Sequence, residues 1–182
     1  MKVAYIDIET NYVGPFTDPR LFSDFQNHKL TVVGVRVLND QQDDFFQFFD
    51  QDCTKAALLQ VLDGVQKLIS YNGRSIPDSI KHRVGFDFPV INAQLGILLD
   101  REFQHTDLVP ECWKKNLFGG LKKVEETLGL KRKLPGKDGA WASEAYRQFK
   151  STGDKKYLEE LLAYNREDVF MLREVEALLA KR

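Results

Sequence analysis

The side chain that fits its predicted surroundings least is Asp168, in the helix expected over residues 154–180. At about 100° per residue, several apolar and aromatic side chains, among them Tyr164 and Leu172, fall within roughly 40° of it on the helix surface. Asp168 is therefore in the middle of the stripe that should face the core. Because burying an unpaired charge is costly, this carboxylate must be protonated, paired with a base or bound to a cation. A solvent gap or an arginine partner is the alternative that involves no chemistry.

Two more carboxylates conflict with the strand that carries them. Asp7 and Glu9 lie two residues apart, hence on one face, at the carboxyl end of a strand expected over residues 3–8. Mutual repulsion raises the pKa of one member of such a pair, whereas a divalent cation lets both stay ionised. Taken alone, such a pair is more often a strand end that meets water.

A fourth carboxylate, Asp87, opens a helix where the chain reads GFDFPVI, and its simplest role there is an N-cap. The strand end, this helix start and the buried helix face can converge if both helices pack beside the central strand. Four carboxylates without a histidine or thiolate form an oxygen site suited to Mg²⁺ or Mn²⁺.

The elements that must position these residues follow from the hydrophobic pattern. Residues 3–8 hold apolar side chains at both odd and even positions, as in a central strand covered on both sides. Residues 30–38 and 44–49 are strand-like runs joined by a polar turn, which predicts a hairpin. Helical spacing runs from Thr54, a plausible N-cap, to about residue 69, and a short strand is expected at 68–71.

The second half of the chain is predicted to be mostly helical. After a loop over 72–85, a helix begins near Asp87, and a fifth strand is expected at 102–109. Three more helices are expected at 121–128, 141–150 and 154–180. These elements predict an α/β fold with a mixed five-stranded sheet, three antiparallel strands followed by parallel ones, flanked by helices in a single domain over residues 1–182.

Composition excludes several functional classes. The 182 residues hold 26 Lys+Arg against 27 Asp+Glu, so the chain is not a bulk polycation. No signal segment opens the chain and no apolar run of about 18 residues could span a bilayer, which predicts a soluble, cytoplasmic protein without membrane contact. Two cysteines, Cys53 and Cys112, are too few for a disulfide framework and lack partners at zinc-ligand spacing.

Three motifs resemble, in order, those of the DEDD superfamily of 3′–5′ exonucleases, which has a ribonuclease-H-like fold. They are YIDIET at 5–10, YNG at 71–73 together with Phe86-Asp87, and YNREDV at 164–169. A tyrosine four residues before the last aspartate is typical of the tyrosine subgroup. Within this subgroup, the closer resemblance is to small stand-alone predicted exonucleases related to the proofreading domain of family B DNA polymerases. The stretch GLKKVEETLG at 120–129 is similar to a helix of those proteins, and the resemblance covers residues 3 to about 172.

The second motif departs from the family pattern. The family sets its aspartate closer to the asparagine, but fifteen positions separate Asn72 from Asp87 here. Residues 74–84 look like an insertion. Asp78 lies nearer the usual distance and is the rival ligand, yet it lacks the preceding aromatic residue and the following apolar helix. Asp87 is therefore the expected ligand.

The resemblance implies phosphodiester hydrolysis assisted by two divalent metal ions, Mg²⁺ or Mn²⁺. Asp7 would bridge both ions, Glu9 and Asp168 would complete the ion that activates water, and Asp87 would act mainly through the other ion. Tyr164 lies one helical turn from Asp168 and could hold the attacking water by a hydrogen bond.

Substrate contacts are expected from Thr10, which matches a position that the family places beside the terminal nucleotide, and from Asn72 on the same side. Four aromatic side chains could stack on bases: Tyr12, Phe16, Trp113 and Trp141. Packing is the simpler role for the two tryptophans. The three histidines are assigned no role. A basic cluster could contact phosphates, with solvated charges as the equal alternative: Lys114, Lys115, Lys122, Lys123, Lys131, Arg132, Lys133 and Lys137.

The expected function is a metal-dependent 3′–5′ exonuclease acting on single-stranded or frayed 3′ ends of DNA or RNA and releasing nucleoside 5′-monophosphates. An endonuclease on the same fold and a catalytically weakened nucleic-acid-binding domain are the alternatives. The residues do not distinguish DNA from RNA, because contacts to the 2′-hydroxyl depend on loop geometry.

Overall fold

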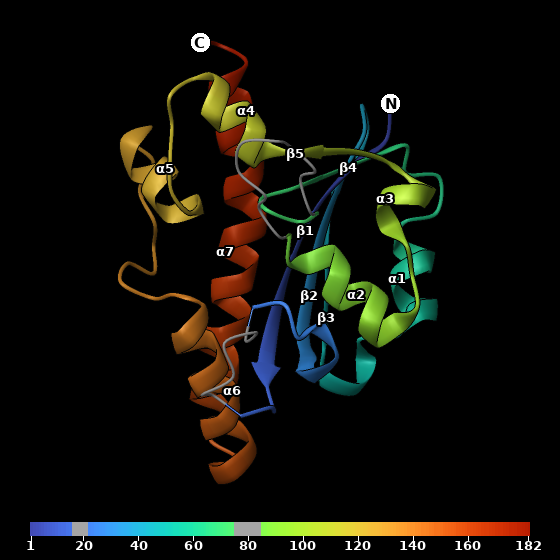
Figure 1. The fold of residues 1–182 in the computed structure, drawn as a ribbon, viewed down its shortest axis with the longest axis vertical. Helices are drawn as coiled ribbons and strands as arrows, with labels where there is room; N and C mark the ends of the chain where they lie inside the picture. The colour runs from blue at the N-terminus through green and yellow to red at the C-terminus, as the bar shows by residue number, and fades with distance from the viewer. Residues whose placement is uncertain (16–21, 75–84) are drawn as a thin grey trace.

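The computed structural model describes residues 1–15, 22–74 and 85–182 of the protein. Its sheet has the strand order β3-β2-β1-β4-β5. Strands β1 to β3 pair antiparallel, whereas β4 pairs parallel with both β1 and β5. The predicted mixed sheet with the first strand at its centre is therefore confirmed (Figure 1). The strands are β1 (Val3–Tyr12), β2 (His28–Leu38), β3 (Asp43–Phe49), β4 (Lys67–Ser70) and β5 (Gln104–Asp107).

Helices cover both faces of this sheet (Figure 1). One face carries α1 (Lys55–Val61), α2 (Asp87–Leu95) and α3 (Leu99–Glu102). The other carries α4 (Leu108–Lys114), α5 (Leu121–Thr127), α6 (Gly139–Thr152) and α7 (Lys155–Leu179). Two short 3₁₀ turns, Phe25–Asn27 and Asp50–Asp52, flank β2 and β3. None of the described helices is long and apolar enough to cross a bilayer. The cytoplasmic location stays a prediction.

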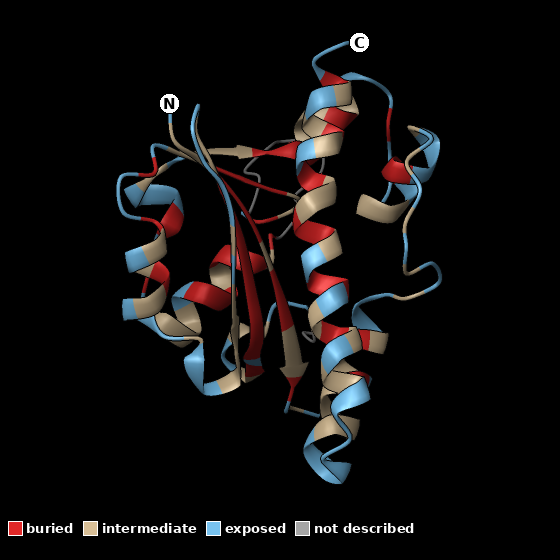
Figure 2. Cartoon of the chain, turned by 180° about the vertical axis from the view of Figure 1, so that it is seen from behind, coloured by how far each residue is buried: buried red, intermediate tan, exposed pale blue. Residues whose placement is uncertain are grey.

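The two faces of β1 have different partners because successive side chains of a strand point in opposite directions. Ala4, Ile6 and Ile8 are buried in the apolar cluster under α1 and α2. Tyr5 lies in the cluster under α7, and Asp7 is hydrogen-bonded to α7. Figure 2 shows the buried residues concentrated along the central strands and on the inner side of α7. The strand therefore presents its carboxylates to the longest helix.

Strand β1 is longer than predicted, since it runs to Tyr12 instead of ending at Ile8. It pairs with β2 along this whole length, with a register shift between Glu9 and Thr10. The pairing partner is distant in sequence, so the polar residues beyond Ile8 carry no local strand signal. The prediction that Asp7 lies at a strand end is wrong; it lies inside the strand, close to an irregularity of the kind that redirects side chains.

Helix α1 is shorter than predicted. Thr54 is its N-cap as expected and accepts a hydrogen bond from the backbone N–H of Ala57, but the helix ends at Val61. The chain then turns at Gly64, whose φ is 69°, and enters β4 at Lys67. The apolar spacing continued through this turn because the turn residues also pack against the core.

The predicted strand at 102–109 is divided between two elements. Only Gln104–Asp107 is extended, and α4, which the pattern did not predict, begins at the next residue. Asp107 caps α4 by accepting a hydrogen bond from the backbone N–H of Val109. The helix predicted from Asp87 likewise stops at Leu95, because Gly96 takes a left-handed conformation with φ of 67°. The last three helices lie close to their predicted places.

Gly34 lets α7 approach the sheet closely. It pairs with Asp7 across β1 and β2, and a Cβ atom at this position would lie 2.3 Å from Oδ1 of Asn165 and 2.8 Å from a methyl of Val169. Both of those side chains belong to α7 and are buried. A glycine is therefore needed for the helix to contact the strand that carries the carboxylates.

Replacing Gly34 with alanine should destabilise the fold by about 1–3 kcal/mol, because the new methyl overpacks the contact between β2 and α7. Urea unfolding measures this change. Gly139→Ala is the matched control, since a Cβ there meets no atom within 4 Å and Gly139 is helical. Equal stability of the two variants would contradict the close approach.

Candidate active site

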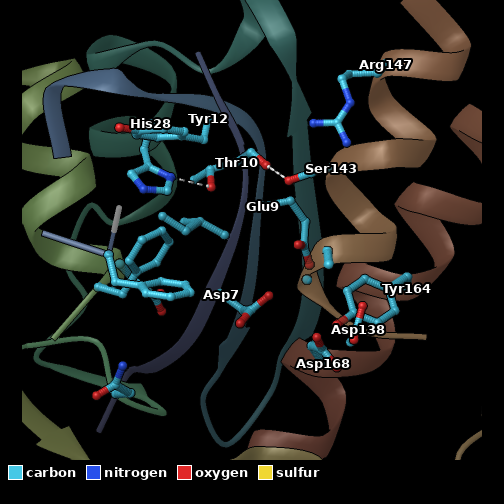
Figure 3. A pocket seen from close by; sticks show the side chains of 17 residues that line it. Asp7, Glu9, Thr10, Tyr12, His28, Asp138, Ser143, Arg147, Tyr164 and Asp168 are labelled. Carbon is cyan, nitrogen blue, oxygen red and sulfur yellow. Dashed lines mark hydrogen bonds between the residues drawn. The ribbon is translucent and has the colours of Figure 1, made fainter. Parts of the chain in front are cut away.

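A cavity of about 730 Å³ opens where β1, the start of α2, and helices α6 and α7 meet. All four predicted metal ligands line it: Asp7, Glu9, Asp87 and Asp168. Figure 3 shows Asp7 and Glu9 of β1 across from Asp168 and Tyr164 of α7. Residues from three distant parts of the chain thus converge as predicted.

Three of these carboxylates form a compact group. Asp7, Glu9 and Asp168 each offer an oxygen atom, and these oxygens all lie within 4.8 Å of one another. Glu9 and Asp168 are buried, and Asp7 is partly buried. A group of carboxylate oxygens at this spacing is the donor set that Mg²⁺ and Mn²⁺ prefer.

Asp87 lies outside this trio but on the wall of the same cavity. The alternative that Asp87 caps α2 is wrong, because the N-cap is Phe86 and Asp87 is the first helical residue. Its Oδ2 atom is buried and accepts no hydrogen bond from any residue that the structure describes. Such an orphaned oxygen is suited to a ligand or cation in the cavity. Its rival Asp78 lies outside the described residues.

The site holds more negative than positive charge. Burial raises the pKa of Asp7 well above its ordinary value, and the charge of Asp168 raises it further. The pKa of Glu9 is raised by the same two causes, and that of Asp87 first by burial. Lys122 works in the opposite direction on Asp7 and Glu9 but does not offset these effects. A divalent cation would supply the missing positive charge, so the residues present fit such an ion.

Asp7 is held in place by α7. Asn165 donates through Nδ2 to Oδ2 of Asp7 at 3.0 Å, and its own Oδ1 accepts from Nε2 of Gln47 at 2.9 Å. Asn165 is fully buried. The sequence placed Asn165 in the third motif without assigning it a role. An amide side chain on the buried stripe, three residues before Asp168, was the feature of the sequence that could have indicated this role.

Asp168 combines the two interpretations that the sequence left open. It lies with Asp7 and Glu9, and its Oδ1 also forms an ion pair with Nη1 of Arg132. Arg132 is itself buried between Asp168 and Glu125. Burial is the largest single effect and lowers the pKa of Arg132, but Glu125 and Asp168 together outweigh it, so the pKa of Arg132 is raised. The sequence included Arg132 in the basic cluster that could contact phosphates. Its burial shows that it is not a surface contact for phosphate.

Tyr164 lies on the same side of α7 as Asp168 and lines the cavity. Its hydroxyl accepts a hydrogen bond from Nζ of Lys122, which also lies 4.5 Å from the ring centroid. Its ring packs against Trp141 at a centroid distance of 5.6 Å. Burial, followed by the charge of Asp168, raises the pKa of Tyr164, so the side chain stays a neutral phenol.

The predicted substrate residues Thr10 and Asn72 also line the cavity. Oγ1 of Thr10 is hydrogen-bonded to Nδ1 of His28 at 3.1 Å, and its carbonyl accepts from Oγ of Ser143 at 2.6 Å (Figure 3). Asn72 has a left-handed backbone with φ of 63°, fixed by a hydrogen bond from its N–H to Oδ1 of Asp107. Oδ1 of Asn72 is buried and has no hydrogen-bond partner among the described residues.

One wall of the cavity is aromatic; of its members the sequence singled out only Tyr12, which was expected to stack on bases. His28, which was assigned no role, lies against Tyr12 at 4.9 Å and against Phe86 at 4.8 Å between ring centroids. Phe22 and Arg147 of α6 line the same cavity. Strand pairing places His28 opposite Tyr12, and Phe86 is the residue before α2, so the wall is built from distant parts of the chain.

Most members of the predicted basic cluster already have acidic or aromatic partners. Lys114 and Lys123 pair with glutamates of their own helices, and Lys137 pairs with Glu160 and lies 3.7 Å from the Trp141 ring centroid. Trp141 therefore packs, as the simpler interpretation held. Phe16 lies outside the described residues. Three lysines of the cluster are exposed and form no ion pair among the described residues: Lys115, Lys131 and Lys133.

The raised carboxyl pKa values predict that the cation-free protein loses stability as the pH rises. Asp7 and Glu9 bind protons more tightly in the folded state than in the unfolded chain, where carboxyl pKa values are about 4. Their contribution to stability is present in full below about pH 4 and is lost as the pH rises through the raised folded values. Urea unfolding in EDTA should therefore show the stability of the wild type falling relative to Asp7→Asn above about pH 4.

Asp63→Asn serves as the control, because Asp63 is exposed. Its profile should run parallel to that of the wild type. A parallel profile for Asp7→Asn as well would contradict the charge excess in the site.

Comparison with protein families identifies the chain's relatives. Residues 4–180 match the family RNase_H_2 of the RNase H superfamily. Comparison with curated proteins gives no match. The β3-β2-β1-β4-β5 sheet flanked by helices agrees with the fold of this superfamily. From the match over nearly its whole length, the chain belongs to the RNase_H_2 family of the RNase H superfamily.

Proposed function

We propose that this protein is a metal-dependent 3′–5′ exonuclease of the DEDD type, tyrosine subgroup. The observation that carries the proposal is the trio Asp7, Glu9 and Asp168, whose oxygens lie within 4.8 Å of one another in a cavity also lined by Asp87 and Tyr164. Membership of the RNase H superfamily supports a nuclease. The order of the three motifs supports the exonuclease subgroup.

Divalent cations, Mg²⁺ or Mn²⁺, would be held by Asp7, Glu9 and Asp168, with Asp87 serving a second ion. Bound there, they would activate water and stabilise the charge on the departing 3′ oxygen. Two of these carboxylates have protein partners that hold them, since Asn165 donates to Asp7 and Arg132 forms an ion pair with Asp168. This preorganisation supports a hydrolytic role.

Tyr164 would orient the attacking water. Its phenol stays protonated because burial and Asp168 raise its pKa, so it donates a hydrogen bond and does not serve as a base. The hydrogen bond that its oxygen accepts from Lys122 fixes the hydroxyl in the cavity. The O–H proton remains available for a water or a phosphate oxygen.

The substrate would be a single-stranded or frayed 3′ end of DNA or RNA. Rings of Tyr12 and Phe86 line one side of the cavity and suit stacking on an unpaired base. Thr10 and Asn72 would contact the terminal nucleotide, because both line the cavity beside the carboxylates. A paired base would not present its face to this wall, which favours unpaired ends.

Release of mononucleotides from single strands tests the proposal. In Mn²⁺, the wild type should degrade single-stranded DNA or RNA labelled at the 5′ end to a ladder that shortens from the 3′ end. Asp7→Asn and Asp168→Asn should each reduce the rate by about 100-fold or more, the order of effect for losing a preorganised electrostatic contact at a reacting group. Glu159→Gln, an exposed carboxylate on the same helix as Asp168, should leave the rate unchanged.

Equal rates for wild type and Asp7→Asn would refute the assignment. Internal fragments instead of a ladder would indicate an endonuclease. Binding of single strands without any hydrolysis would favour the weakened nucleic-acid-binding domain, an alternative supported by the position of Asp87 outside the trio.

The second-motif ligand is tested by comparing two variants. Asp87→Asn should lose activity, because the orphaned oxygen of Asp87 lines the cavity. Asp78→Asn should retain wild-type activity in the same assay. The reverse result would reassign the ligand to Asp78.

A further inference from the structure

Arg132 connects two carboxylates that belong to different parts of the molecule. Its Nε donates to Oε2 of Glu125 at 2.5 Å and its Nη2 donates to Oε1 at 2.7 Å, a bidentate pair. The Arg132 side chain is 8% exposed and that of Glu125 is 2% exposed. The arginine is thus fixed in the interior by α5 on one side of its guanidinium.

The remaining nitrogen of the guanidinium faces α7. Nη1 forms an ion pair with Oδ1 of Asp168 and lies 4.0 Å from Oε2 of Glu167. Glu167 in turn accepts hydrogen bonds from the backbone N–H groups of Lys133 and Leu134. The chain just after Arg132 is therefore also attached to α7, so the contact with Asp168 has support on both sides.

Asp168 has neighbours on two sides. Arg132 contacts one of its oxygens, while Asp7 and Glu9 each offer an oxygen within 4.8 Å of an oxygen of Asp168. A carboxylate on a helix can rotate about its side-chain bonds, and a fixed cationic partner restricts that rotation. Partners of this kind, which touch a ligand and not the metal, commonly tune metal affinity.

We propose that Arg132, anchored by Glu125, is a positioning residue that orients Asp168 toward the cation site. The inference rests on the proposed function, because it assigns Arg132 to the divalent ion that the trio would bind. The orienting effect depends on the planar shape of the guanidinium. Only a fork with separate nitrogens can hold both oxygens of Glu125 and still reach Asp168.

Three physical roles for Arg132 predict different effects on binding of the ion. If the fork orients Asp168, replacing it with a lysine that keeps the charge should weaken binding of the ion. If the arginine supplied charge alone, lysine would suffice. If it merely occupied the place of the ion, removing its charge would strengthen binding, since like charges repel.

The test is Mn²⁺ binding to the protein without nucleic acid, measured by isothermal titration calorimetry. Arg132→Lys should weaken Mn²⁺ binding by about 10–100-fold, the usual effect of losing a partner of a metal ligand. Arg36→Lys is the matched control: Arg36 makes a bidentate pair with Asp43, its side chain is also 8% exposed, and it is not among the described residues that line the cavity. This control should bind Mn²⁺ as the wild type does.

A second variant covers the case in which Arg132→Lys does not fold. In the double variant Glu125→Leu with Arg132→Met, an apolar pair replaces the buried ion pair and leaves no charge of Glu125 unpaired. It should also bind Mn²⁺ more weakly than the wild type, with circular dichroism confirming the fold.

Wild-type affinity in a folded Arg132→Lys, or tighter binding in the double variant, would overturn the positioning role while leaving the proposed function intact. Absence of Mn²⁺ binding by the wild type would overturn both.

Discussion

The gathering of three carboxylates between β1 and α7 is the constraint on which the rest of the site depends. Like charges within 4.8 Å of one another repel, and burial makes that repulsion stronger. A fold that keeps Asp7, Glu9 and Asp168 together must stabilise them through other contacts. It must also leave a place for positive charge between them, which is why the arrangement indicates chemistry and not packing.

The supporting contacts lie around the outside of the trio. Asn165 holds Asp7 from α7, Arg132 holds Asp168 from the segment after α5, and Lys122 of α5 holds Tyr164. Helix α5 thus carries Lys122, and three residues after it Glu125, whose side chain holds Arg132 in place. Short as it is, α5 fixes both site residues of the long helix from the side away from the sheet.

The cavity separates two kinds of surface. Asp7, Glu9, Asp168 and Tyr164 lie where β1 meets α7, while the aromatic wall includes Tyr12 and His28, which pair across β1 and β2. The register shift after Glu9 lies at the boundary between them, and Thr10 beyond it bonds to His28 of the wall. This division would let one strand hold the reacting phosphate and the adjoining base in a fixed relation.

Local pattern alone singled out Asp7, Glu9 and Asp168, which the structure brings together, and predicted the elements on which they lie. The conflict of Asp168 with an apolar stripe and of Asp7 and Glu9 with a core strand was visible because periodicity needs no knowledge of distant partners, and it predicted the mixed sheet and the last three helices. Tertiary structure decided the rest: the extension of β1 to Tyr12, the aromatic position of His28, the anchoring of Asp7 by Asn165, and the burial of Arg132 against Asp168. Each of these depends on strand pairing or on contacts between residues far apart in the chain. The spacing of residues along a sequence cannot determine such contacts.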